Sequence, residues 1–444
     1  MMTHPDLAVY AARRARLMAE LGSDAVAVLA TAPERLRNRD SHYPYRFDSH
    51  FYYLTGFAEP EAVLVLHGAS GRSILFCRER DPEREIWDGL RYGPQAAREA
   101  FGFDEAWPIG ELDQRLPDWL SGQAALHCVL GEDAAWDRRV LDWLQALRAL
   151  ARNGVQAPRG MFDLRRVLDA MRLIKDEHEI AIMQRSADIA AAAHCRAMRA
   201  TRPGMNEYQI EAELLYEFRR QGAQAPAYTS IVAGGAHACV LHYVENNGWL
   251  ADGELLLVDA GCELDGYASD ITRTFPVNGR FTGAARDVYA CVLAAQAAAL
   301  EQVRPGNSWQ APHEAAVRVL AQGMLDWRLL QGSLDGVVES GAYKRFYMHR
   351  TGHWLGLDVH DVGEYKQGGE WRPLQPGMVL TVEPGCYIRA AEDIPQAFCN
   401  IGVRIEDDVL VDVDGHRVLT SAVPSAMAGI EALMAQAGEE REHA

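Results

Sequence analysis

The chain has 444 residues, of which 48% are hydrophobic and 24% are charged, and its formal net charge is −18 at pH 7. This composition is typical of a globular protein long enough for two domains. The acidic charge disfavours nucleic acid and anionic membranes as partners, and no apolar run approaches the ~20 residues of a membrane span. The first six residues lack the basic and then apolar layout of a signal peptide.

The eight cysteines show no C-x-x-C spacing, and most lie in apolar runs. That pattern is typical of reduced core residues and not of a disulfide framework or a thiolate metal site. We therefore expect a cytoplasmic protein.

Residues 1–172 are predicted to form an α/β domain. A helix is expected at 6–21, where apolar residues recur at helical spacing and Gly22 follows. Trp87 stands among charged residues, so it is either a core or surface residue or a contact for a partner or substrate. The later elements of the domain are expected as strands at 25–29, 51–54, 62–66 and 73–77 and as helices at 94–101 and 136–151.

A linker is predicted at 154–160, which holds two glycines and a proline. Beyond it we expect a second domain at 173–438 and a disordered tail at 439–444. The second domain should open with two helices, one beginning near Lys175 and one capped by Asn206. Its other elements are expected to include strands at 230–233 and 239–243 and helices at about 282–303 and 309–330.

Two stretches of the second domain echo one another. Each is an apolar, β-branched run that ends in an acid, Asp259 or Glu383, and each is followed by an extended run with another acid, Asp270 or Glu406. Such runs predict buried strands, where a carboxylate must be paired, protonated or bound to metal. The repeated acid positions predict an internally duplicated α+β domain.

The first pair of acids has a predicted geometry. A hairpin with 263–266 as its loop would place Asp259 directly opposite Asp270, with Cβ atoms roughly 5 Å apart. Two like charges facing each other in a buried sheet repel and raise at least one pKa, and a divalent cation between them removes the repulsion. The alternative is an acid at a strand end that caps neighbouring backbone.

Three histidines, His349, His353 and His360, lie between the two acidic stretches. The glycines among them favour an extended segment with tight turns, and no glutamate follows His349, so the helical zinc-protease motif is absent. A single histidine is more often a hydrogen-bonded core residue, but three beside four acids favour a site.

Four carboxylates carry a charge of −4, which balances two divalent cations. Two such ions roughly 3.5–4 Å apart can activate water and polarise a carbonyl together. Oxygen-rich ligand sets favour Mn²⁺ or Mg²⁺, with Co²⁺ and Zn²⁺ as competitors.

The motifs resemble those of the pita-bread metallopeptidases, and among them the aminopeptidase P family. The matching segments are VDAG at 258–261, SDITRTF at 269–275, GHWLGLDVHD at 352–361, TVEPG at 381–385 and GVRIEDD at 402–408. Shorter matches at 38–41, 51–57, 59–62 and 85–87 extend the likeness over nearly the whole chain. The resemblance implies a creatinase-like α/β N-terminal domain followed by an α+β pita-bread catalytic domain with internal pseudo-two-fold duplication.

The resemblance also implies residue roles. The metal ligands would be Asp259, Asp270, His353, Glu383 and Glu406, of which Asp270 and Glu406 would bridge both ions. Glu383 would handle the proton of a bridging hydroxide, while His242 and His360 would contact the substrate and stabilise the oxyanion. Further substrate or supporting contacts would come from His349, which would line the proline pocket, and from Tyr387, Arg404 and Trp87. The family's Gly-Leu-Ser after the first histidine is Arg350-Thr351-Gly352 here, which bears on the shape of that pocket.

The implied activity is release of the N-terminal residue from peptides with proline in the second position, by a metal-bridging hydroxide in a homo-oligomer, dimer or tetramer. The nearest alternative is prolidase, which shares fold and ligands but takes Xaa-Pro dipeptides and needs a cationic anchor for their carboxylate. Another alternative is a metal-free pita-bread binding module. Such a protein is expected to have lost ligand acids, whereas all of them are present in this sequence. A creatinase-like chain would lack this metal set, and the first domain argues against methionine aminopeptidase.

Overall fold

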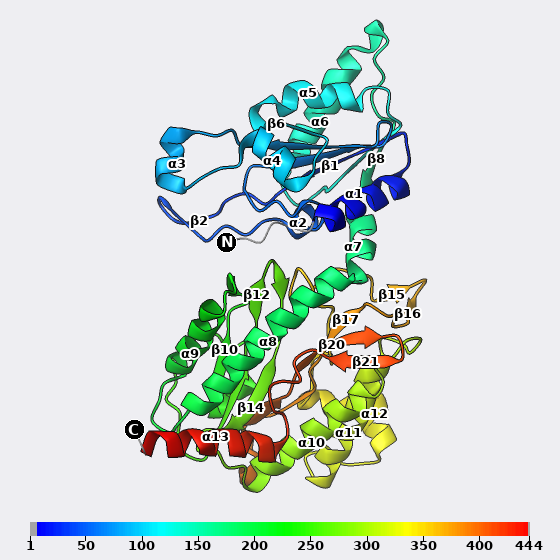
Figure 1. Ribbon diagram of the computed structural model, residues 1–444. Helices are drawn as coiled ribbons and strands as arrows, with labels where there is room; N and C mark the ends of the chain where they lie inside the picture. Colours follow the sequence, from blue (N-terminus) through cyan, green and yellow to red (C-terminus); the bar gives the residue numbers. More distant parts are fainter. Residues whose placement is uncertain (1–6, 443–444) are drawn as a thin grey trace. The chain divides into compact units, whose positions relative to one another are not determined.

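The computed structural model describes residues 7–442 and divides into two compact units, Met1–Met171 and Arg172–Ala444 (Figure 1). Of the tail expected at 439–444, residues 439–442 belong to the last helix, α13 (Met427–Glu442). Residues 443 and 444 lie outside the described part. The helix α7 (Arg165–Leu173) runs across the boundary between the units.

The first unit is built on a six-stranded mixed sheet in the order β6-β5-β4-β1-β7-β8. Its central strand, β1 (Ala25–Ala30), pairs antiparallel with β4 and parallel with β7. Buried strand residues such as Val28 and Ile74 form one core with buried helix residues such as Leu116 and Leu144. The other elements are β2 (Leu36–Asn38), β3 (Ser41–His42), β4 (Val63–His67), β5 (Arg72–Cys77), β6 (Glu105–Pro108), β7 (Ala125–Cys128), β8 (Gly160–Asp163), α1 (Leu7–Leu21), α2 (Ser49–Thr55), α3 (Pro82–Asp88), α4 (Gly93–Phe101), α5 (Leu112–Leu120) and α6 (Ala134–Ala149).

The strand expected at 51–54 is wrong, because these residues form the helix α2. The Asp48 side chain accepts the backbone N–H of Phe51 at 2.7 Å and caps the start of the helix. Gly56 ends it with a φ of 63°, a conformation that glycine adopts without strain. The aromatic residues that favour a strand are therefore overruled by an aspartate before them and a glycine after them.

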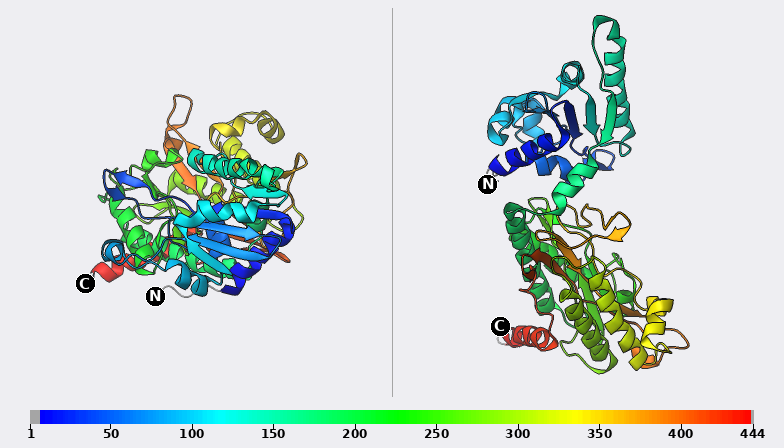
Figure 2. Two further views of the ribbon diagram at one scale, coloured as in Figure 1. Left: turned by 90° about the horizontal axis from the view of Figure 1, so that it is seen from above. Right: turned by 90° about the vertical axis from the view of Figure 1, so that its right-hand side faces the viewer.

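The second unit repeats one arrangement twice, with two helices followed by a long antiparallel hairpin in each half. In the first half α8 (Glu177–Ala200) and α9 (Glu207–Arg220) pack beside the strands, and in the second half α10 (Gly283–Leu300) packs beside the strands and against α11 (Ala311–Asp326) (Figures 1 and 2). The predicted cap at Asn206 is confirmed: α8 and α9 both begin with a reciprocal capping box.

The strands of the second unit fall into small antiparallel sheets, chiefly β10-β11-β14 in the first half and β17-β20-β21 in the second. The first half contains β9 (Ala225–Pro226), β10 (Ile231–Gly234), β11 (Leu255–Asp259), β12 (Cys262–Leu264), β13 (Tyr267–Ala268) and β14 (Thr272–Pro276). The second half contains α12 (Leu334–Ser340), β15 (Lys366–Gln367), β16 (Glu370–Trp371), β17 (Val379–Val382), β18 (Gly385–Ile388), β19 (Ile401–Arg404), β20 (Asp407–Asp412) and β21 (Gly415–Val418).

The register of the first hairpin differs from the expected one. Asp259 lies opposite Thr272, not opposite Asp270, because the turn is the two-residue pair Asp265-Gly266. Both turn residues have positive φ, at 49° and 83°, as a tight hairpin turn of this kind requires. A register shift of two residues preserves the face of the strand, so Asp259 and Asp270 still share one face as diagonal neighbours.

The two halves are joined by buried polar contacts. Thr272 forms an isolated antiparallel bridge with Glu406. Arg273 is 1% exposed, and its guanidinium donates to the carbonyl of Glu406 at 2.6 Å and to the Asp407 carboxylate at 2.6 Å. It also donates to the carbonyls of Val423 and Pro424, both at 3.1 Å. One arginine of the first half is therefore saturated mainly by the second half.

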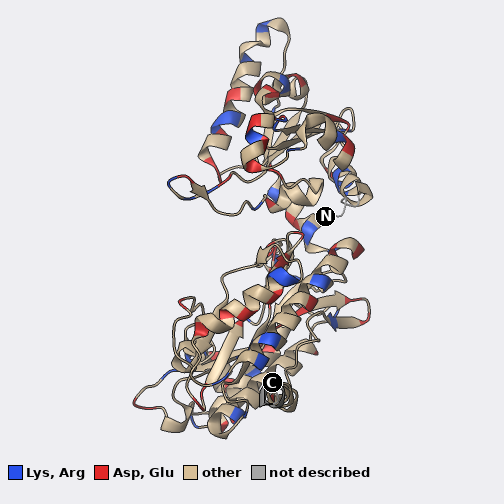
Figure 3. Ribbon diagram, turned by 60° about the vertical axis from the view of Figure 1, so that its left-hand side comes forward, with Lys and Arg blue, Asp and Glu red and all other residues tan. Residues whose placement is uncertain are grey.

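Charged residues of both signs are interleaved along both units in the view of Figure 3. The net charge of −18 is therefore spread along the chain instead of being gathered in one segment. Within residues 7–442 no helix combines the length and the apolar character that crossing a membrane demands.

A buried ion cluster stands directly behind the histidine-bearing segment. Asp361 accepts from Arg172 at 2.5 Å and from Lys175 at 2.8 Å, and all three side chains are at most 2% exposed. Arg172 also donates to Asp358, whose side chain is 43% exposed. Burial alone would raise the pKa of Asp361, but the charges of Lys175 and Arg172 outweigh it and lower that pKa.

We expect Asp361→Asn to lower the free energy of unfolding by about 3–5 kcal/mol, because two buried cations lose their shared carboxylate. Asp358→Asn is the matched control, since it removes a partly exposed partner of the same arginine and should cost at most about 1 kcal/mol. Denaturant unfolding of the two variants measures the difference. Equal losses would mean that the buried cluster does not stabilise the segment.

Candidate active site

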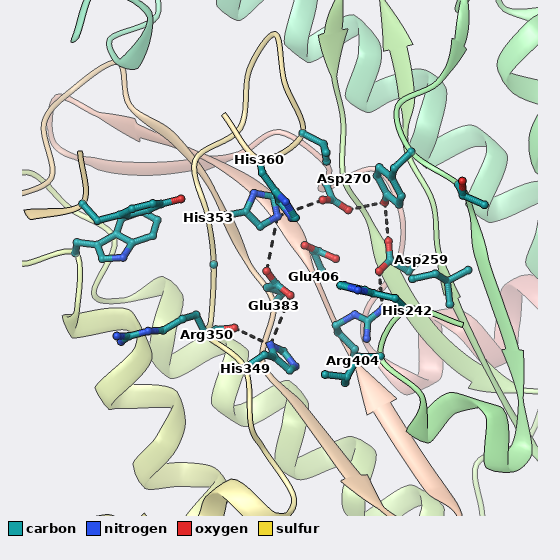
Figure 4. A pocket seen from close by; sticks show the side chains of 18 of the residues that line it. His242, Asp259, Asp270, His349, Arg350, His353, His360, Glu383, Arg404 and Glu406 are labelled. Carbon is teal, nitrogen blue, oxygen red and sulfur yellow. Dashed lines mark hydrogen bonds and ion pairs between the residues drawn. The ribbon is translucent and has the colours of Figure 1, made fainter. Parts of the chain in front are cut away.

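A cavity of about 910 Å³ lies in the second unit and is lined by residues of both halves (Figure 4). The structure brings together all five residues predicted as metal ligands: Asp259, Asp270, His353, Glu383 and Glu406. It adds His242, His349, His360 and Arg404 to the same lining. Asp259 is the last residue of β11, and Glu383 directly follows β17. Asp270 and Glu406 lie just before β14 and β20, where the chain passes from one strand pairing to the next.

Asp259 and Asp270 converge on one phenol. The Tyr228 hydroxyl lies 2.6 Å from an Asp259 oxygen and 2.5 Å from an Asp270 oxygen. Because a hydroxyl has a single hydrogen to donate, it satisfies one of these acceptors at a time. The other oxygen needs a proton or a cation, which fits a metal site.

His353 is oriented as a ligand. Its Nδ1 lies 2.9 Å from the carbonyl of Trp354, which favours a hydrogen on Nδ1 and turns Nε2 toward the carboxylates, where it could bind a cation once it loses its own hydrogen. Nε2 faces Asp270 at 3.4 Å and Glu383 at 3.7 Å. Ligand atoms of Asp270, His353 and Glu406 lie within 4.8 Å of one another, which is compact enough for them to share a cation.

The pKa values report uncompensated negative charge. Burial and the neighbouring charges of Asp270, Glu383 and Asp259 raise the pKa of Glu406 well above its usual range. Burial is also the main reason that the pKa of Glu383 rises to about 7. Burial alone would lower the pKa of His353, but the hydrogen bond to Asp270 and the charges of Glu383 and Asp270 outweigh it and raise that pKa to about 9. Hard carboxylates of this kind, with one imidazole, fit divalent cations.

Arg404 supplies part of the countercharge. It is 4% exposed and donates to Asp259 at 2.5 Å, to the Tyr387 hydroxyl at 3.0 Å and to the Thr272 hydroxyl at 3.1 Å. The Tyr387 hydroxyl also lies 2.8 Å from Nε2 of His349. Tyr387 thus supports the lining from behind, between Arg404 and His349.

His242 and His360 line the cavity from two different segments. The strand expected at 239–243 does not form; a short 3-10 helix, Gly235–Cys239, occupies its start. Side chains hold this region in place of a β ladder, since buried Glu207 accepts from the Tyr243 hydroxyl at 2.8 Å beside His242. The ring of His360 stacks edge-on to that of His353, with centroids 4.4 Å apart.

Trp87 is not among the cavity residues. It lies in α3 of the first unit, where its side chain is 83% exposed. The interpretation of Trp87 as a core residue of that unit is therefore wrong, and its exposure leaves a surface or partner-contact role.

Three residues of the site escaped the sequence analysis. Tyr228 has no pattern that marks it. The Thr272 hydroxyl donates to Glu406 at 2.6 Å, and the correct hairpin register would have found it. Asp408 is 1% exposed and accepts the backbone N–H of Asp270 at 3.1 Å. Its position two residues after Glu406, on the same face of the chain, is the signal that could have found it.

Metal should stabilise the protein more as the pH rises. Without metal, Glu383 has a folded pKa of about 7 against an ordinary 4.5, and His353 about 9 against 6.5. Both folded values are raised, so the stability they contribute is fully present below the ordinary pKa and is lost as the pH passes through 7 and then 9. We expect the difference in Tm between Mn²⁺-loaded and chelated protein to widen from about pH 5 to about pH 8, measured by calorimetry. A difference that stays constant over this range would contradict the charge assignment.

A duplicated α+β unit that gathers four carboxylates and one imidazole at a cavity between its halves defines a pita-bread metallohydrolase. Residues 181–412 match the family model of metallopeptidase family M24, and residues 10–127 match that of the aminopeptidase P N-terminal domain. The chain belongs to metallopeptidase family M24, a family that uses divalent metal ions. The predicted fold class and the predicted enzyme class are thereby confirmed.

The similarity to known proteins extends over nearly the whole chain. The Xaa-Pro aminopeptidase of Escherichia coli is 45% identical over 428 residues, which cover 96% of this chain and 97% of that protein. The structure of the Pseudomonas aeruginosa aminopeptidase PepP is similar with a TM-score of 0.96 and 50% identity, covering 99% of this chain and 100% of that one. E. coli aminopeptidase P in complex with the inhibitor Pro-Leu is similar with a TM-score of 0.95 and 44% identity, covering 98% and 100%.

Proposed function

We propose that this protein is an aminopeptidase that releases the N-terminal residue from peptides with proline in the second position. The convergence of Asp259, Asp270, His353, Glu383 and Glu406 on one cavity carries the proposal. The full-length similarity to Xaa-Pro aminopeptidases, one of them seen with Pro-Leu, supports the proline specificity.

Asp259, Asp270, His353, Glu383 and Glu406 would hold two divalent ions. When bound, the ions supply an activated water and a Lewis acid at the scissile carbonyl. Glu383, beside the ions, would hold and pass on the proton that the reaction moves from water to the leaving proline nitrogen. The carboxylates of Asp259, Asp270, Glu383 and Glu406 form an acidic floor of the cavity. The α-amino group of the peptide would bind at this floor, which would restrict cleavage to the N-terminal bond.

His360 donates a hydrogen bond to the oxygen of the scissile carbonyl as charge develops there. Burial and the charge of His353 lower the pKa of His360 in the metal-free protein. A neutral ring still carries one N–H for this purpose. His242 contacts the substrate from the other half. His349, held by Tyr387 at 2.8 Å, lines the space for the proline ring.

The native metal, the cellular compartment and the oligomeric state are proposed from the ligands, the cysteines and the exposed apolar surface. The oxygen-rich ligands favour Mn²⁺ as the native metal, with Co²⁺, Mg²⁺ and Zn²⁺ able to compete. The eight cysteines are all free, which supports a reducing compartment such as the cytoplasm. The exposed side chains of Ile86, Trp87 and Leu90 support a homo-oligomer, since monomers rarely expose adjacent large apolar residues.

Hydrolysis of two peptides tests the function. The purified protein should release the first residue of Gly-Pro-Leu after Mn²⁺ is added to chelated enzyme, and should act far more slowly on Gly-Pro. Chelation should abolish both reactions. Faster cleavage of Gly-Pro would indicate a dipeptidase, and full activity of protein shown to be free of metal would exclude a metallopeptidase.

A further inference from the structure

One wall of the cavity is chemically unlike the acidic floor. Its aromatic residues are Trp309, Tyr365 and Trp371, and its cations are Arg350 and Lys366. In Figure 4 the Arg350 side chain extends away from the cluster of carboxylates. The cavity therefore has carboxylates at one end and cations at the other.

Both cations contact the same ring. The Arg350 guanidinium lies 4.8 Å from the centroid of Trp371, and the Lys366 ammonium lies 4.4 Å from the same centroid. Lys366 and Trp371 face each other across the hairpin of β15 and β16, whose turn is Gly368-Gly369. The hairpin is anchored at its base, because the N–H of Trp309 donates to the carbonyl of Arg372 at 2.9 Å.

Neither cation forms an ion pair within the part of the chain that the structure describes. Arg350 donates to the neutral amide oxygen of Gln310 at 2.6 Å, which orients the guanidinium without neutralising it. Two like charges against one indole repel each other, and a carboxylate bound at this wall would offset the unpaired positive charge. The planar guanidinium is suited to a bidentate contact with such a carboxylate.

The order of residues fixes which part of a peptide reaches this wall. His349, beside the proline space, and Arg350 are consecutive and both line the cavity. A peptide whose α-amino group lies at the acidic floor passes His349 with its proline and then reaches Arg350 with the residue after the proline. We propose that Arg350, Lys366 and Trp371 form a carboxylate-binding subsite that recognises a negative charge on the C-terminal side of the substrate's proline. This subsite rests on the proposed aminopeptidase activity.

Matched peptides test the subsite. We expect kcat/KM for Gly-Pro-Leu with a free C-terminus to exceed that for its C-terminal amide by roughly tenfold, the scale of one charge-assisted hydrogen bond. A second pair, C-terminally amidated Gly-Pro-Asp-Leu and Gly-Pro-Asn-Leu, asks whether a side-chain carboxylate also serves. A preference in the first pair assigns the subsite to peptide C-termini, and a preference in the second assigns it to acidic residues. Cleavage of all four peptides at equal kcat/KM overturns the subsite, whereas cleavage of none overturns the proposed function instead.

Variants locate the preference. In Arg350→Gln and in Lys366→Gln the ratio of kcat/KM between charged and neutral peptide should fall toward one. Lys344→Gln, which removes an exposed lysine outside the cavity lining, should keep the ratio of the unmodified protein. Because Lys366 is on an exposed hairpin, its variant keeps the test decisive if Arg350→Gln does not fold. A ratio that persists in both cavity variants would overturn the assignment.

Discussion

Replacing Glu406 by glutamine is expected to remove metal and peptidase activity together while making the metal-free protein more stable. Both effects have one cause. Glu406 is 2% exposed and its pKa is raised by burial and by the charges of Asp270, Glu383 and Asp259, so its ionised form is unfavourable until a cation is present. An amide is a poorer metal ligand and carries no charge, so it weakens the bound state and relieves the free one.

Metal analysis, turnover and thermal unfolding in chelator decide this prediction on one preparation. Activity should fall by more than about 10³, and the Tm in chelator should rise by a few degrees if about 1 kcal/mol of repulsion is relieved. Glu339→Gln, at an exposed helical position, is the matched control and should change neither quantity. A Glu406→Gln protein that keeps two tightly bound ions and near-normal turnover would show that this acid is no ligand.

Replacing His360 by alanine is expected to lower kcat and kcat/KM alike, by roughly 10²–10³, with metal content unchanged. The loss falls on kcat because the contact strengthens only as charge develops on the carbonyl oxygen. His360 is not in the ligand cluster of Asp270, His353 and Glu406, so the ions should remain. His360→Gln, which keeps an N–H donor, should recover part of the rate.

The competing explanation for His360 is structural. Its neighbour Asp361 belongs to the buried ion cluster with Arg172 and Lys175, so the alanine variant could disturb that cluster. In that case Tm would fall while the turnover of folded molecules stayed normal, and His360→Gln would not restore the rate. Loss of metal in His360→Ala would instead assign the histidine to the ligand set.

The sequence predicted the acids of the site better than their arrangement. Glu383, Glu406 and their counterparts were found because an acid after a buried apolar run requires a partner. The register was missed by two residues, since a four-residue loop at 263–266 and the actual Asp265-Gly266 turn differ little in sequence but displace every pairing. Because the error was an even number of residues, the acids kept their common face and still line one cavity.

Other features could not be read from local patterns. Tyr228 and Asp408 reach the site only through tertiary packing, with contacts 31 and 138 residues away in the chain. The region around His242 is held by Glu207 of a distant helix. The strand predicted at 239–243 did not form because these residues have no neighbouring strand to pair with. The aromatic run at 51–54 was decided by its flanking Asp48 and Gly56, which short-range propensity does not weigh.

The buried Arg273 has a consequence for how far the duplication can be taken apart. Its guanidinium is saturated by Glu406, Asp407, Val423 and Pro424, all of which belong to the other half. A fragment that ended before β19 would lose all of these partners and keep only the carbonyl of Thr272, so it could not keep the native packing around Arg273. The repeated halves are therefore not independent modules, because the packing around a buried residue of one half depends on residues of the other.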